Sequence, residues 1–444
     1  MTAHKSSILQ ELSWRAMIAQ TTHDELDEAL FTSSTTLYCG FDPSASSLHV
    51  GNLVGIMALA FFQRHGHNPV ALVGGATGLI GDPSGKSEER NLLTDDVLEE
   101  NLAGIGAQLR TILDRAMALH PETVGPGAHP RRADVPPLVN NADWMKTWSY
   151  IDFLREVGKH FRVNAMLAKD SVRTRLEERE QGISYTEFSY MLIQAYDFLH
   201  LYQQNGCTLQ IGGSDQWGNI TAGTELIRKK TGAPAFGLTF PLITSATGQK
   251  LGKSEQGAVW LDAERTSPYQ FYQYWISIDD RDVIKLLRFF TFLGQAEVEV
   301  LEAELEAGQN QGQLQRRLAL EVTALVHGQD EADKALRASR MLFGERIEGL
   351  SDRDLNSVFA DVPSTTVARA SLADGELLLV DLLVETSLQK SKGEARRLLA
   401  QGGAYINNER VDDPNARVTL ASLASESMLV LRAGKKNYHV VRIG

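Results

Sequence analysis

Three polar side chains share one face of a predicted helix. Tyr190, Gln194 and Asp197 are spaced i, i+4 and i+7 within YMLIQAYDFL, and most of the residues around them are apolar. The apolar neighbours predict that this face is buried, where polar groups need hydrogen-bonding partners. A polar ligand would satisfy them, and so would an intramolecular network. The stripe is therefore a candidate binding site, with both interpretations open.

A second candidate lies at the start of a helix. His49-Val50-Gly51-Asn52 follows a Gly/Pro/Ser-rich turn and opens a long apolar helix that begins near Leu48. The amino end of a helix has unpaired N–H groups and a partial positive charge, so it suits an anion such as a triphosphate. Taken alone, a capping asparagine and a hydrogen-bonded histidine would explain the same four residues.

Two loops offer further chemistry. The run GGATGLIGDPSGKS at 74–87 is not a phosphate-binding P-loop. That motif needs four residues between its glycine and the final Gly-Lys-Ser, which would place a glycine at Ile80, and Gly81 leaves only three. A tight turn beside a ligand fits better, with Asp82 facing a cationic group. The lysines of KLGKS at 250–254 would neutralise phosphate charge in a transition state, or would form a solvated charged loop.

These residues need a framework that brings them together. Short strands through Tyr38, at Val70–Val73 and in TLQIGGSDQWGN alternate with loops and helices, which predicts a parallel α/β sheet with its ligand at the carboxyl ends of the strands. A proline-rich stretch at 120–137 is interpreted as a surface loop. Helical patterns run from Ser267-Pro268 to about Leu350.

The last part of the chain, from residue 351 onward, has a different sequence pattern. Residues 351–375 have little periodicity and are interpreted as a linker. They precede one predicted amphipathic helix, LLVETSLQKSKGEARRLLAQGG, and several short β-rich runs. Residues 376–444 carry ten Lys/Arg against eight Asp/Glu, whereas the whole chain has a net charge of -12. A body this acidic argues against a coat for non-specific nucleic-acid binding, but a local basic face still permits an RNA partner.

Composition excludes several classes of protein. The 444 residues are 43% hydrophobic and 23% charged, which is ordinary for a globular chain. No apolar run reaches the ~18 residues of a membrane span, and the first residues have no apolar signal core, so we expect a cytoplasmic protein. Cys39 and Cys207 are the only cysteines, which excludes a disulfide scaffold or a Cys-rich metal cage.

Taken together and in order, the motifs resemble those of bacterial tyrosyl-tRNA synthetases, a family of class I aminoacyl-tRNA synthetases. The resemblance rests on YCGFDPSASSLHVGN, GGATGLIGDPSGKS, YMLIQAYDF, QIGGSDQWGN and KLGKS, and extends from about Trp14 to the C-terminus. It implies a Rossmann-like α/β catalytic domain at 1–264, a helical anticodon-side domain at 265–350, the linker at 351–375 and a small RNA-binding domain at 376–444. A homodimer is expected because the family forms one.

The resemblance also assigns roles. His49, Asn52, Lys250, Lys253 and Ser254 match the two signature motifs that bind ATP and stabilise the transition state. The set expected at tyrosine comprises Tyr38, Asp82, Tyr190, Gln194, Asp197 and Gln216. The set expected at ATP comprises Cys39, Gly40, Asp42, Ser44, His49, Gly51, Asn52, Gly213, Asp215, Lys250 and Lys253. For tRNA, the helix containing Lys390, Lys392, Arg396 and Arg397 is a candidate phosphate-contacting face.

The implied reaction joins tyrosine to tRNA(Tyr) through tyrosyl-adenylate. Magnesium is expected on the phosphates of ATP, with no protein-bound metal or organic cofactor, no membrane and no DNA partner. One departure is Asn52, which stands where the family usually has a second histidine and cannot become cationic. The rival hypotheses are a tryptophanyl-tRNA synthetase of the same fold and an inactive synthetase-derived RNA-binding protein. Tyr38 with Asp197 suits a phenol rather than an indole, and the intact lysines argue against an inactive protein.

Overall fold

The computed structural model describes residues 4–84, 93–121, 132–169, 172–173, 176, 182–249, 251–254, 257–309, 312–342, 344–360, 362–373, 377–434 and 437–444. The chain divides into two compact units. The first consists of residues 1–265 and 276–326, and the second of residues 266–275 and 327–444. The predicted helical domain at 265–350 is therefore shared between the two units.

The first unit is built on a six-stranded sheet. Its order is β1 (Gln20–Thr21), β6 (Phe236–Phe240), β5 (Cys207–Gly213), β2 (Thr36–Phe41), β3 (Asn68–Val73) and β4 (Leu138–Asn140). All neighbours pair in parallel except β1, which is antiparallel to β6. The chain leaves β2 toward β3 on one side and later returns to β5 on the other, so the strand order reverses between β2 and β5. A ligand crevice is expected at the carboxyl ends of these strands.

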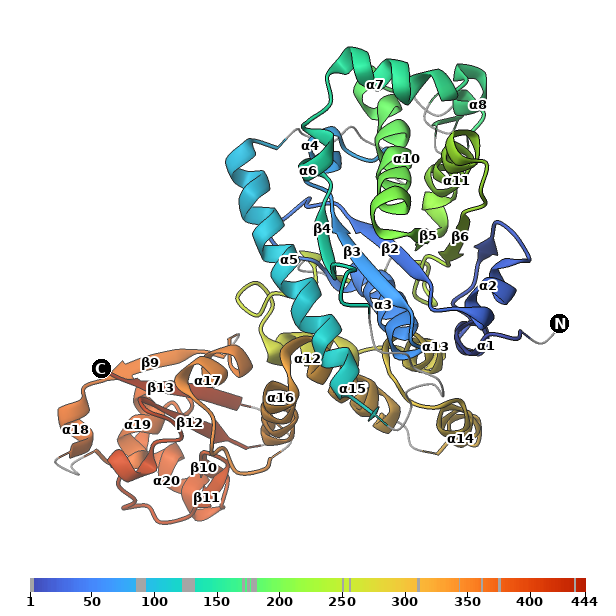
Figure 1. The fold of residues 1–444 in the computed structure, drawn as a ribbon. Helices are drawn as coiled ribbons and strands as arrows, with labels where there is room; N and C mark the ends of the chain where they lie inside the picture. The colour runs from blue at the N-terminus through green and yellow to red at the C-terminus, as the bar shows by residue number, and fades with distance from the viewer. Residues whose placement is uncertain are drawn as a thin grey trace. The chain divides into compact units, whose positions relative to one another are not determined.

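Helices cover both faces of this sheet (Figure 1). The sheet-covering helices are α3 (Leu53–Arg64), α5 (Asp95–Ala118), α10 (Tyr185–Asn205) and α11 (Trp217–Thr231). Successive side chains of β2 point to opposite faces. Cys39 therefore lies against Gly55 of α3, whereas Tyr38 packs on Phe198 of α10 with ring centroids 5.5 Å apart. The predicted α/β class with a Rossmann-like parallel sheet is confirmed.

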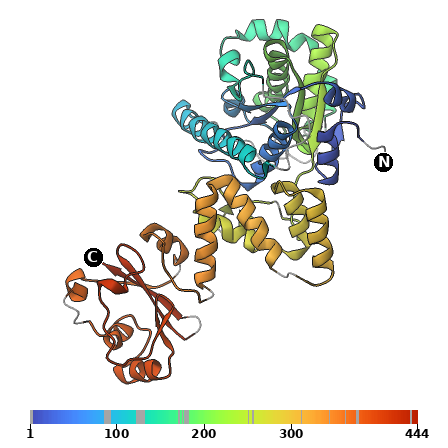
Figure 2. The same ribbon diagram turned by 60° about the horizontal axis from the view of Figure 1, so that its bottom comes forward.

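Smaller elements complete the first unit. They are α1 (Ser7–Trp14), α2 (Leu26–Thr32), η1 (Val50–Asn52), α4 (Thr77–Ile80), α6 (Ala142–Met145), α7 (Tyr150–Glu156), η3 (Gly158–His160), α8 (Val163–Leu167), η4 (Ser214–Gln216), β7 (Lys253–Ser254), β8 (Gly257–Ala258), α13 (Asp280–Phe290), α14 (Gln295–Glu306) and α15 (Gln313–His327). Figure 2 shows α13, α14 and α15 in yellow to orange as a helical layer.

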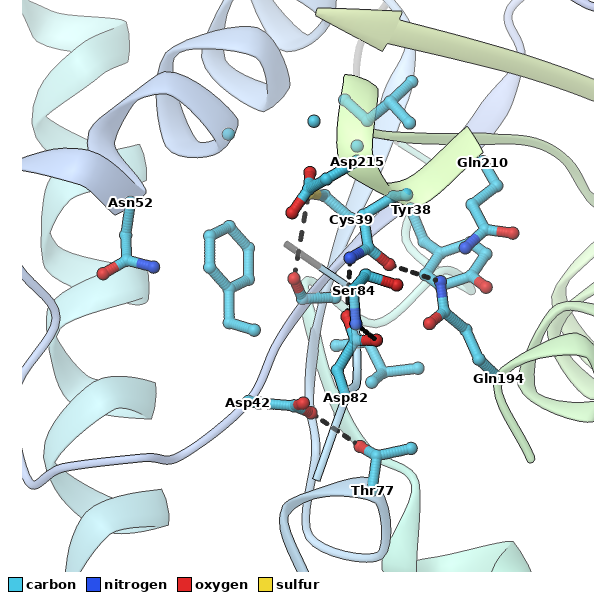
Figure 3. A pocket seen from close by; sticks show the side chains of 18 of the residues that line it. Tyr38, Cys39, Asp42, Asn52, Thr77, Asp82, Ser84, Gln194, Gln210 and Asp215 are labelled. Carbon is cyan, nitrogen blue, oxygen red and sulfur yellow. Dashed lines mark hydrogen bonds between the residues drawn. The ribbon is translucent and has the colours of Figure 1, made fainter. Parts of the chain in front are cut away.

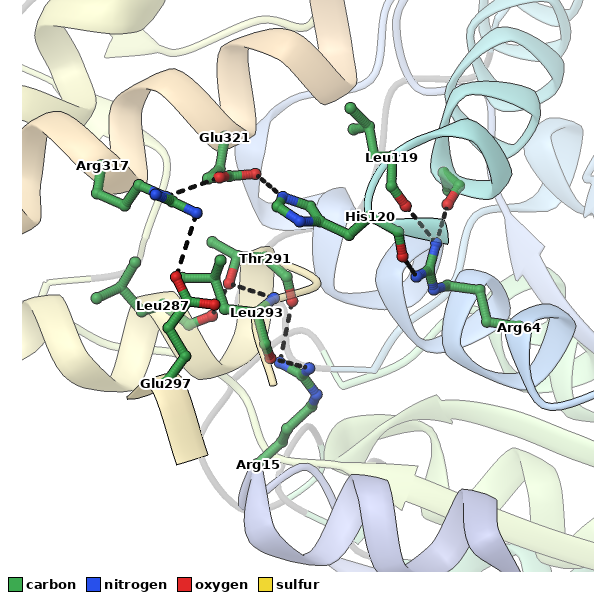
Figure 4. A network of polar contacts seen from close by, with 11 residues as sticks. Arg15, Arg64, Leu119, His120, Leu287, Thr291, Leu293, Glu297, Arg317 and Glu321 are labelled. Atoms are coloured by element: carbon green, nitrogen blue, oxygen red, sulfur yellow. Dashed lines mark hydrogen bonds and ion pairs between the residues drawn. The ribbon is translucent and has the colours of Figure 1, made fainter. Parts of the chain in front are cut away.

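Two buried arginines tie helices of the first unit together (Figure 4). Arg15, at the end of α1, holds the end of α13 in the helical layer, and Arg64 joins α3 to the end of α5. Each guanidinium donates to three backbone carbonyls just beyond the last turn of a helix or within it, at distances of 2.5–3.0 Å. The acceptors of Arg15 are the carbonyls of Arg288, Thr291 and Leu293, and those of Arg64 are the carbonyls of Ala116, Leu119 and His120. Since the carboxyl end of a helix is partly negative, these carbonyls stabilise the buried cations.

The second unit contains a five-stranded sheet ordered β11-β10-β12-β13-β9. Its elements are α12 (Pro268–Ile276), α16 (Gln329–Leu342), α17 (Asp352–Val358), β9 (Ser364–Val367), α18 (Arg369–Ala373), α19 (Leu379–Glu385), α20 (Lys392–Ala400), β10 (Ala404–Ile406), β11 (Glu409–Val411), η5 (Leu420–Ser422), β12 (Met428–Ala433) and β13 (Asn437–Ile443). As predicted, α12 begins at Pro268.

Two predictions for this unit are wrong. Residues 351–375 are not a featureless linker, because they form α17, β9 and α18, and β9 pairs in parallel with β13 at the far end of the chain. The single predicted amphipathic helix is two helices, α19 and α20. Ser387 between them has φ 58°, a left-handed conformation that ends a helix, and Ser391 caps α20 by accepting from the Glu394 N–H at 3.3 Å.

Candidate functional site

A pocket of about 370 Å³ opens at the carboxyl ends of β2, β3 and β5, where the strand order reverses. Its walls come from these strands, the loop after β3, η1, α10 and η4 (Figure 3). The structure brings fifteen of the predicted tyrosine and ATP residues around this one pocket. They are Tyr38, Cys39, Gly40, Asp42, Ser44, His49, Gly51, Asn52, Asp82, Tyr190, Gln194, Asp197, Gly213, Asp215 and Gln216.

Asp197 forms the deep wall of the pocket. Its side chain is 1% exposed and accepts a hydrogen bond at each oxygen, from Asn141 Nδ2 at 2.9 Å and from Trp144 Nε1 at 2.7 Å. Burial raises the pKa of Asp197 to about 7, although both donors favour the ionised form. A carboxylate oxygen accepts more than one hydrogen bond, so Asp197 retains acceptor capacity toward the pocket.

Three buried polar atoms of the pocket lack a hydrogen-bond partner among the described residues. They are the Tyr38 hydroxyl, Gln194 Oε1 and Gln210 Oε1. Tyr38 and Gln210 are paired in the register of β2 and β5, so both side chains lie on the same face of the sheet. Burial, and then the charge of Asp197, raise the pKa of Tyr38, so its hydroxyl stays protonated and can donate. Because unpaired buried polar groups are costly, this end of the pocket is built for a polar ligand group.

Two carboxylates, those of Asp42 and Asp82, also line the pocket. Asp42 accepts from the Tyr190 hydroxyl at 3.0 Å and from Thr77 Oγ1 at 2.8 Å, and Asp82 accepts from Gln216 Nε2 at 2.6 Å. Burial and the charge of Asp42 raise the pKa of Tyr190, which keeps this hydroxyl a donor as well. The arrangement concentrates negative charge beside the tyrosine-lined end and suits a cationic group. Asp42, predicted at ATP, is thus a direct partner of Tyr190.

A hydrogen-bonded chain connects these two parts of the pocket. Asn141 Nδ2 donates to Asp197 and also to Thr77 Oγ1 at 3.1 Å, and Thr77 in turn donates to Asp42. The side-chain oxygen Oδ1 of Asn141 accepts from the Ala76 N–H at 2.7 Å and so holds the glycine-rich loop after β3. The geometry of the loop and the orientation of Asp197 therefore depend on one another.

His49 and Asn52 form a reciprocal cap at the start of η1. The Gly51 N–H donates to His49 Nδ1 at 3.0 Å, and the His49 N–H donates to Asn52 Oδ1 at 3.0 Å. Since Nδ1 is an acceptor, a neutral His49 ring carries its proton on Nε2. The cap also fixes the amide of Asn52 with its oxygen on the backbone, which leaves the NH₂ group as the donor on a residue that lines the pocket.

The loop predicted to supply cations packs on this cap. Gly252 has φ +82°, and a Cβ there would lie 3.0 Å from the Gly51 nitrogen, so only glycine fits. Lys250 lies outside the described residues. Lys253 and Ser254 form β7, which pairs with β8, and their backbone alone is described. The positions of the lysine ammonium groups therefore stay predictions.

Sequence reasoning missed several residues of the site. Asn141 and Trp144 follow the very short strand β4, and Gln210 lies within β5; the others that line or brace the pocket include Leu72, Thr77, Ser84, Ile211, Asn219 and Leu242. One available signal was the Asn140-Asn141 pair at the carboxyl end of a strand, the position at which parallel sheets place their ligand-binding groups.

The predicted tRNA-contacting residues lie in the second unit. Arg396 and Arg397 are exposed on α20, whereas Lys390 lies in the turn before the helix and not on it. Lys392 is exposed but forms an ion pair with Asp381 at 2.7 Å, which compensates its charge. The exposed cationic face of the helix is thus smaller than the sequence indicated.

Neither a metal cluster nor a membrane span is found in the part of the chain that the structure describes. No group of three or more His, Cys, Asp or Glu side chains there could hold a metal ion. No described helix is long and apolar enough to cross a membrane.

Comparison with known proteins places this geometry in context. Residues 32–344 match the family model described as "tRNA synthetases class I (W and Y)", and residues 354–441 match "Tyrosine--tRNA ligase SYY-like C-terminal domain". The chain is 50% identical to the tyrosine–tRNA ligase of Rhodopirellula baltica, over 99% of this chain and 97% of that protein. It is 49% identical to tyrosine–tRNA ligase 1 of Bacillus subtilis, over 98% and 99% of the two chains. A C-terminally truncated mitochondrial tyrosyl-tRNA synthetase of Aspergillus nidulans superimposes with a TM-score of 0.67 at 31% identity, covering 76% of this chain and 94% of that one.

Proposed function

Because the chain belongs to the tyrosine–tRNA ligases of the class I aminoacyl-tRNA synthetase family, we propose that its pocket holds tyrosine at the buried end and ATP at the open end. The enzyme activates tyrosine with ATP and transfers it to tRNA. The assignment of individual residues to these steps rests on the geometry of the pocket.

The observation that carries the assignment is the pairing of two different polar regions in one pocket. Tyrosine is a zwitterion with a phenol at its far end. Asp197 accepts from the phenol and Tyr38 donates to it, so the hydroxyl of the substrate satisfies both buried groups. The ammonium group lies among Asp82, Tyr190 and Gln194, with Asp42 behind Tyr190. An indole has a donor but no acceptor, and would leave the Tyr38 hydroxyl unpaired.

ATP occupies the part of the pocket nearest η1. The His49–Asn52 cap and the glycine backbone at 40, 51 and 213 permit close approach of the nucleotide, and Cys39, Ser44 and Asp215 line the region of the ribose. Mg²⁺ arrives on the phosphates of ATP as part of the substrate.

The chemistry needs no nucleophile from the protein. The carboxylate of tyrosine, held beside Gln216, attacks the α-phosphorus and pyrophosphate leaves. The terminal ribose hydroxyl of tRNA then attacks the tyrosyl carbonyl and AMP leaves. The protein contributes orientation, and Lys250, Lys253 and Ser254 stabilise the charge that develops on the phosphates.

The second unit provides the contact with tRNA(Tyr). Arg396 and Arg397 on α20 are exposed cations suited to phosphates, and phosphate contacts position an RNA without reading its bases.

The first unit provides the contact with a second copy of the chain. Exposed apolar side chains gather on α7, α8 and the start of α10, with Ile151 64% and Val163 61% exposed. We place the resulting homodimer in the cytoplasm, where tRNA is charged.

Pyrophosphate exchange, measured with each amino acid in turn, tests the assignment. Exchange should require tyrosine, and its rate should fall at least ~100-fold in Asp197→Ala. Lys253→Ala should lower kcat by a larger factor than it raises the KM for tyrosine. Arg281→Ala is a suitable control, because Arg281 is exposed and pairs with Asp279 away from the pocket. Exchange driven by tryptophan would overturn the phenol assignment, and its absence with every amino acid would indicate an RNA-binding protein without activity. A charged residue at Ile151 should yield monomers in sedimentation experiments.

A further inference from the structure

The two signature motifs of the first unit are joined by a third segment of backbone, residues 258–261. The Val50 N–H donates to the Val259 carbonyl at 2.9 Å, and the Leu261 N–H donates to the Leu48 carbonyl at 2.8 Å. On its other side, the Val259 N–H donates to the Gly252 carbonyl at 2.9 Å. The segment therefore lies between the His49 motif and residues 251–254 and is bonded to both.

Two side chains reinforce this junction. The ring of Trp260 meets the ring of His49 edge to face, with centroids 6.2 Å apart, and the backbones of the two residues form a β-bridge. The guanidinium of Arg265 lies 3.4 Å from the centroid of the Trp260 ring. An arginine at this distance is attracted by the negative face of the indole, so it restrains the ring from the solvent side. Trp260 is half-buried and Arg265 is exposed.

The junction also fixes how closely the loop approaches the cap. The Gly252 backbone lies so close to the cap that a Cβ there would lie 3.0 Å from the Gly51 nitrogen and 3.0 Å from Val50 Cβ. Neither motif can move along the 258–261 segment without breaking one of these contacts. The relative position of His49 and the lysine loop is therefore set by the Trp260 segment.

We propose that Trp260 and Arg265 are positioning residues for tyrosine activation: they hold His49 and residues 251–254 in one fixed register. The proposal rests on the function assigned above to His49 and Lys253. Trp260 acts through those residues and touches neither substrate, and Arg265 acts through Trp260.

This arrangement predicts a specific kinetic pattern. A misplacement of about 1 Å in a reacting group lowers a rate by about 10²-fold, so Trp260→Ala should reduce kcat for pyrophosphate exchange by about 10- to 100-fold. The KM for tyrosine should stay within about twofold, because the tyrosine end of the pocket is untouched. Arg265→Ala removes a cation–π contact at an exposed site and should cost about 2- to 5-fold in kcat. Trp260→Phe and Arg265→Lys should each restore most of the rate.

The matched control is Trp14→Ala. Trp14 is also half-buried and stacked on an arginine, with Arg15 at 4.2 Å from its ring, but it belongs to α1 rather than to the pocket. Its removal should lower the melting temperature without the kcat effect. Equal losses of kcat in Trp14→Ala and Trp260→Ala would mean that the loss comes from lower protein stability, and would overturn the proposal.

A double-mutant cycle with Lys253→Ala separates this inference from the function on which it rests. If Trp260 works through the loop, Trp260→Ala should cost little more once Lys253 is gone. Additive losses would overturn the positioning role and leave the role of Lys253 intact. A Lys253→Ala variant with full activity would instead overturn the assigned function of the loop, and this inference with it. Arg265→Ala serves in the same cycle should Trp260→Ala fail to fold.

Discussion

The Tyr38 hydroxyl offers a test in which stability and specificity should change in opposite directions. It is fully buried and has no hydrogen-bond partner among the residues described. Its ring packs on Phe198, and Tyr38→Phe keeps that contact. The substitution therefore removes only an unpaired polar group from the free enzyme, and a hydrogen-bond donor from the complex with tyrosine.

The change in stability and the change in specificity have the same origin, which is the free-energy cost of leaving the buried Tyr38 hydroxyl without a hydrogen bond. An unpaired buried hydroxyl costs about 1–3 kcal/mol, so the free Tyr38→Phe enzyme should be more stable by up to that amount. Binding of tyrosine relieves this cost in the natural enzyme, whereas binding of phenylalanine does not. The preference for tyrosine over phenylalanine should consequently fall by about 5- to 150-fold, which is the same 1–3 kcal/mol expressed as a ratio.

Two measurements decide the matter. Urea unfolding without ligand gives the change in stability, and pyrophosphate exchange with each amino acid gives the ratio of kcat/KM values. Thr36→Val is the matched control, because Thr36 has an unpartnered buried hydroxyl on the same strand, judged over the described residues, but does not line the pocket. It should gain stability and keep its specificity. A Tyr38→Phe enzyme that is less stable, or that rejects phenylalanine as before, would refute the reasoning.

Three further outcomes are expected. Because the pKa of Asp197 is raised to about 7, its contribution to stability is complete below the unfolded pKa and is lost as pH rises toward about 7. Asp197→Asn should therefore make the free energy of urea unfolding less dependent on pH between pH 4 and pH 8. An unchanged pH dependence would contradict the buried, pKa-shifted carboxyl group. Gly252→Ala should lower kcat for adenylate formation by about 10-fold or more, because a side chain there is strained and meets the Gly51 nitrogen; normal exchange kinetics would show that the loop and the cap are not in register. Charge reversal at Arg396 and Arg397 should weaken tRNA charging and its salt dependence while pyrophosphate exchange is preserved, and equal effects on both assays would exclude a specific tRNA contact.

The sequence was sufficient for the parts of the site whose chemistry is local. The His49 cap, the helix face of Tyr190, Gln194 and Asp197, and the strand through Tyr38 each have a signature within a few residues. They meet in one pocket because parallel strands place their carboxyl ends together, which is a property of the fold class.

What escaped prediction depends on distant partners. Asn141 matters because it contacts Asp197, 56 residues away, and nothing near it in the chain indicates that contact. The sequence of residues 351–375 has little periodicity and so predicts a linker, whereas β9 within it becomes a strand by pairing with the distant β13. The break at Ser387 was missed since a serine in a left-handed conformation has no strong local signal.

The two arginine clamps beneath the sheet have a consequence for how this enzyme tolerates amino-acid replacement. Every acceptor of Arg64 in the clamp is a backbone carbonyl, as are three acceptors of Arg15. A backbone carbonyl survives any change of side chain, so these contacts place no demand on the side chains of the six partner positions. Ala116, Thr291 and Leu293 are constrained instead by their own burial. The genetic cost falls almost entirely on the two arginines, where even lysine lacks the planar fork that reaches several carbonyls at once. Random mutagenesis should therefore find the two arginines intolerant of replacement, and the partner positions that are only half-buried, such as Leu119, more permissive.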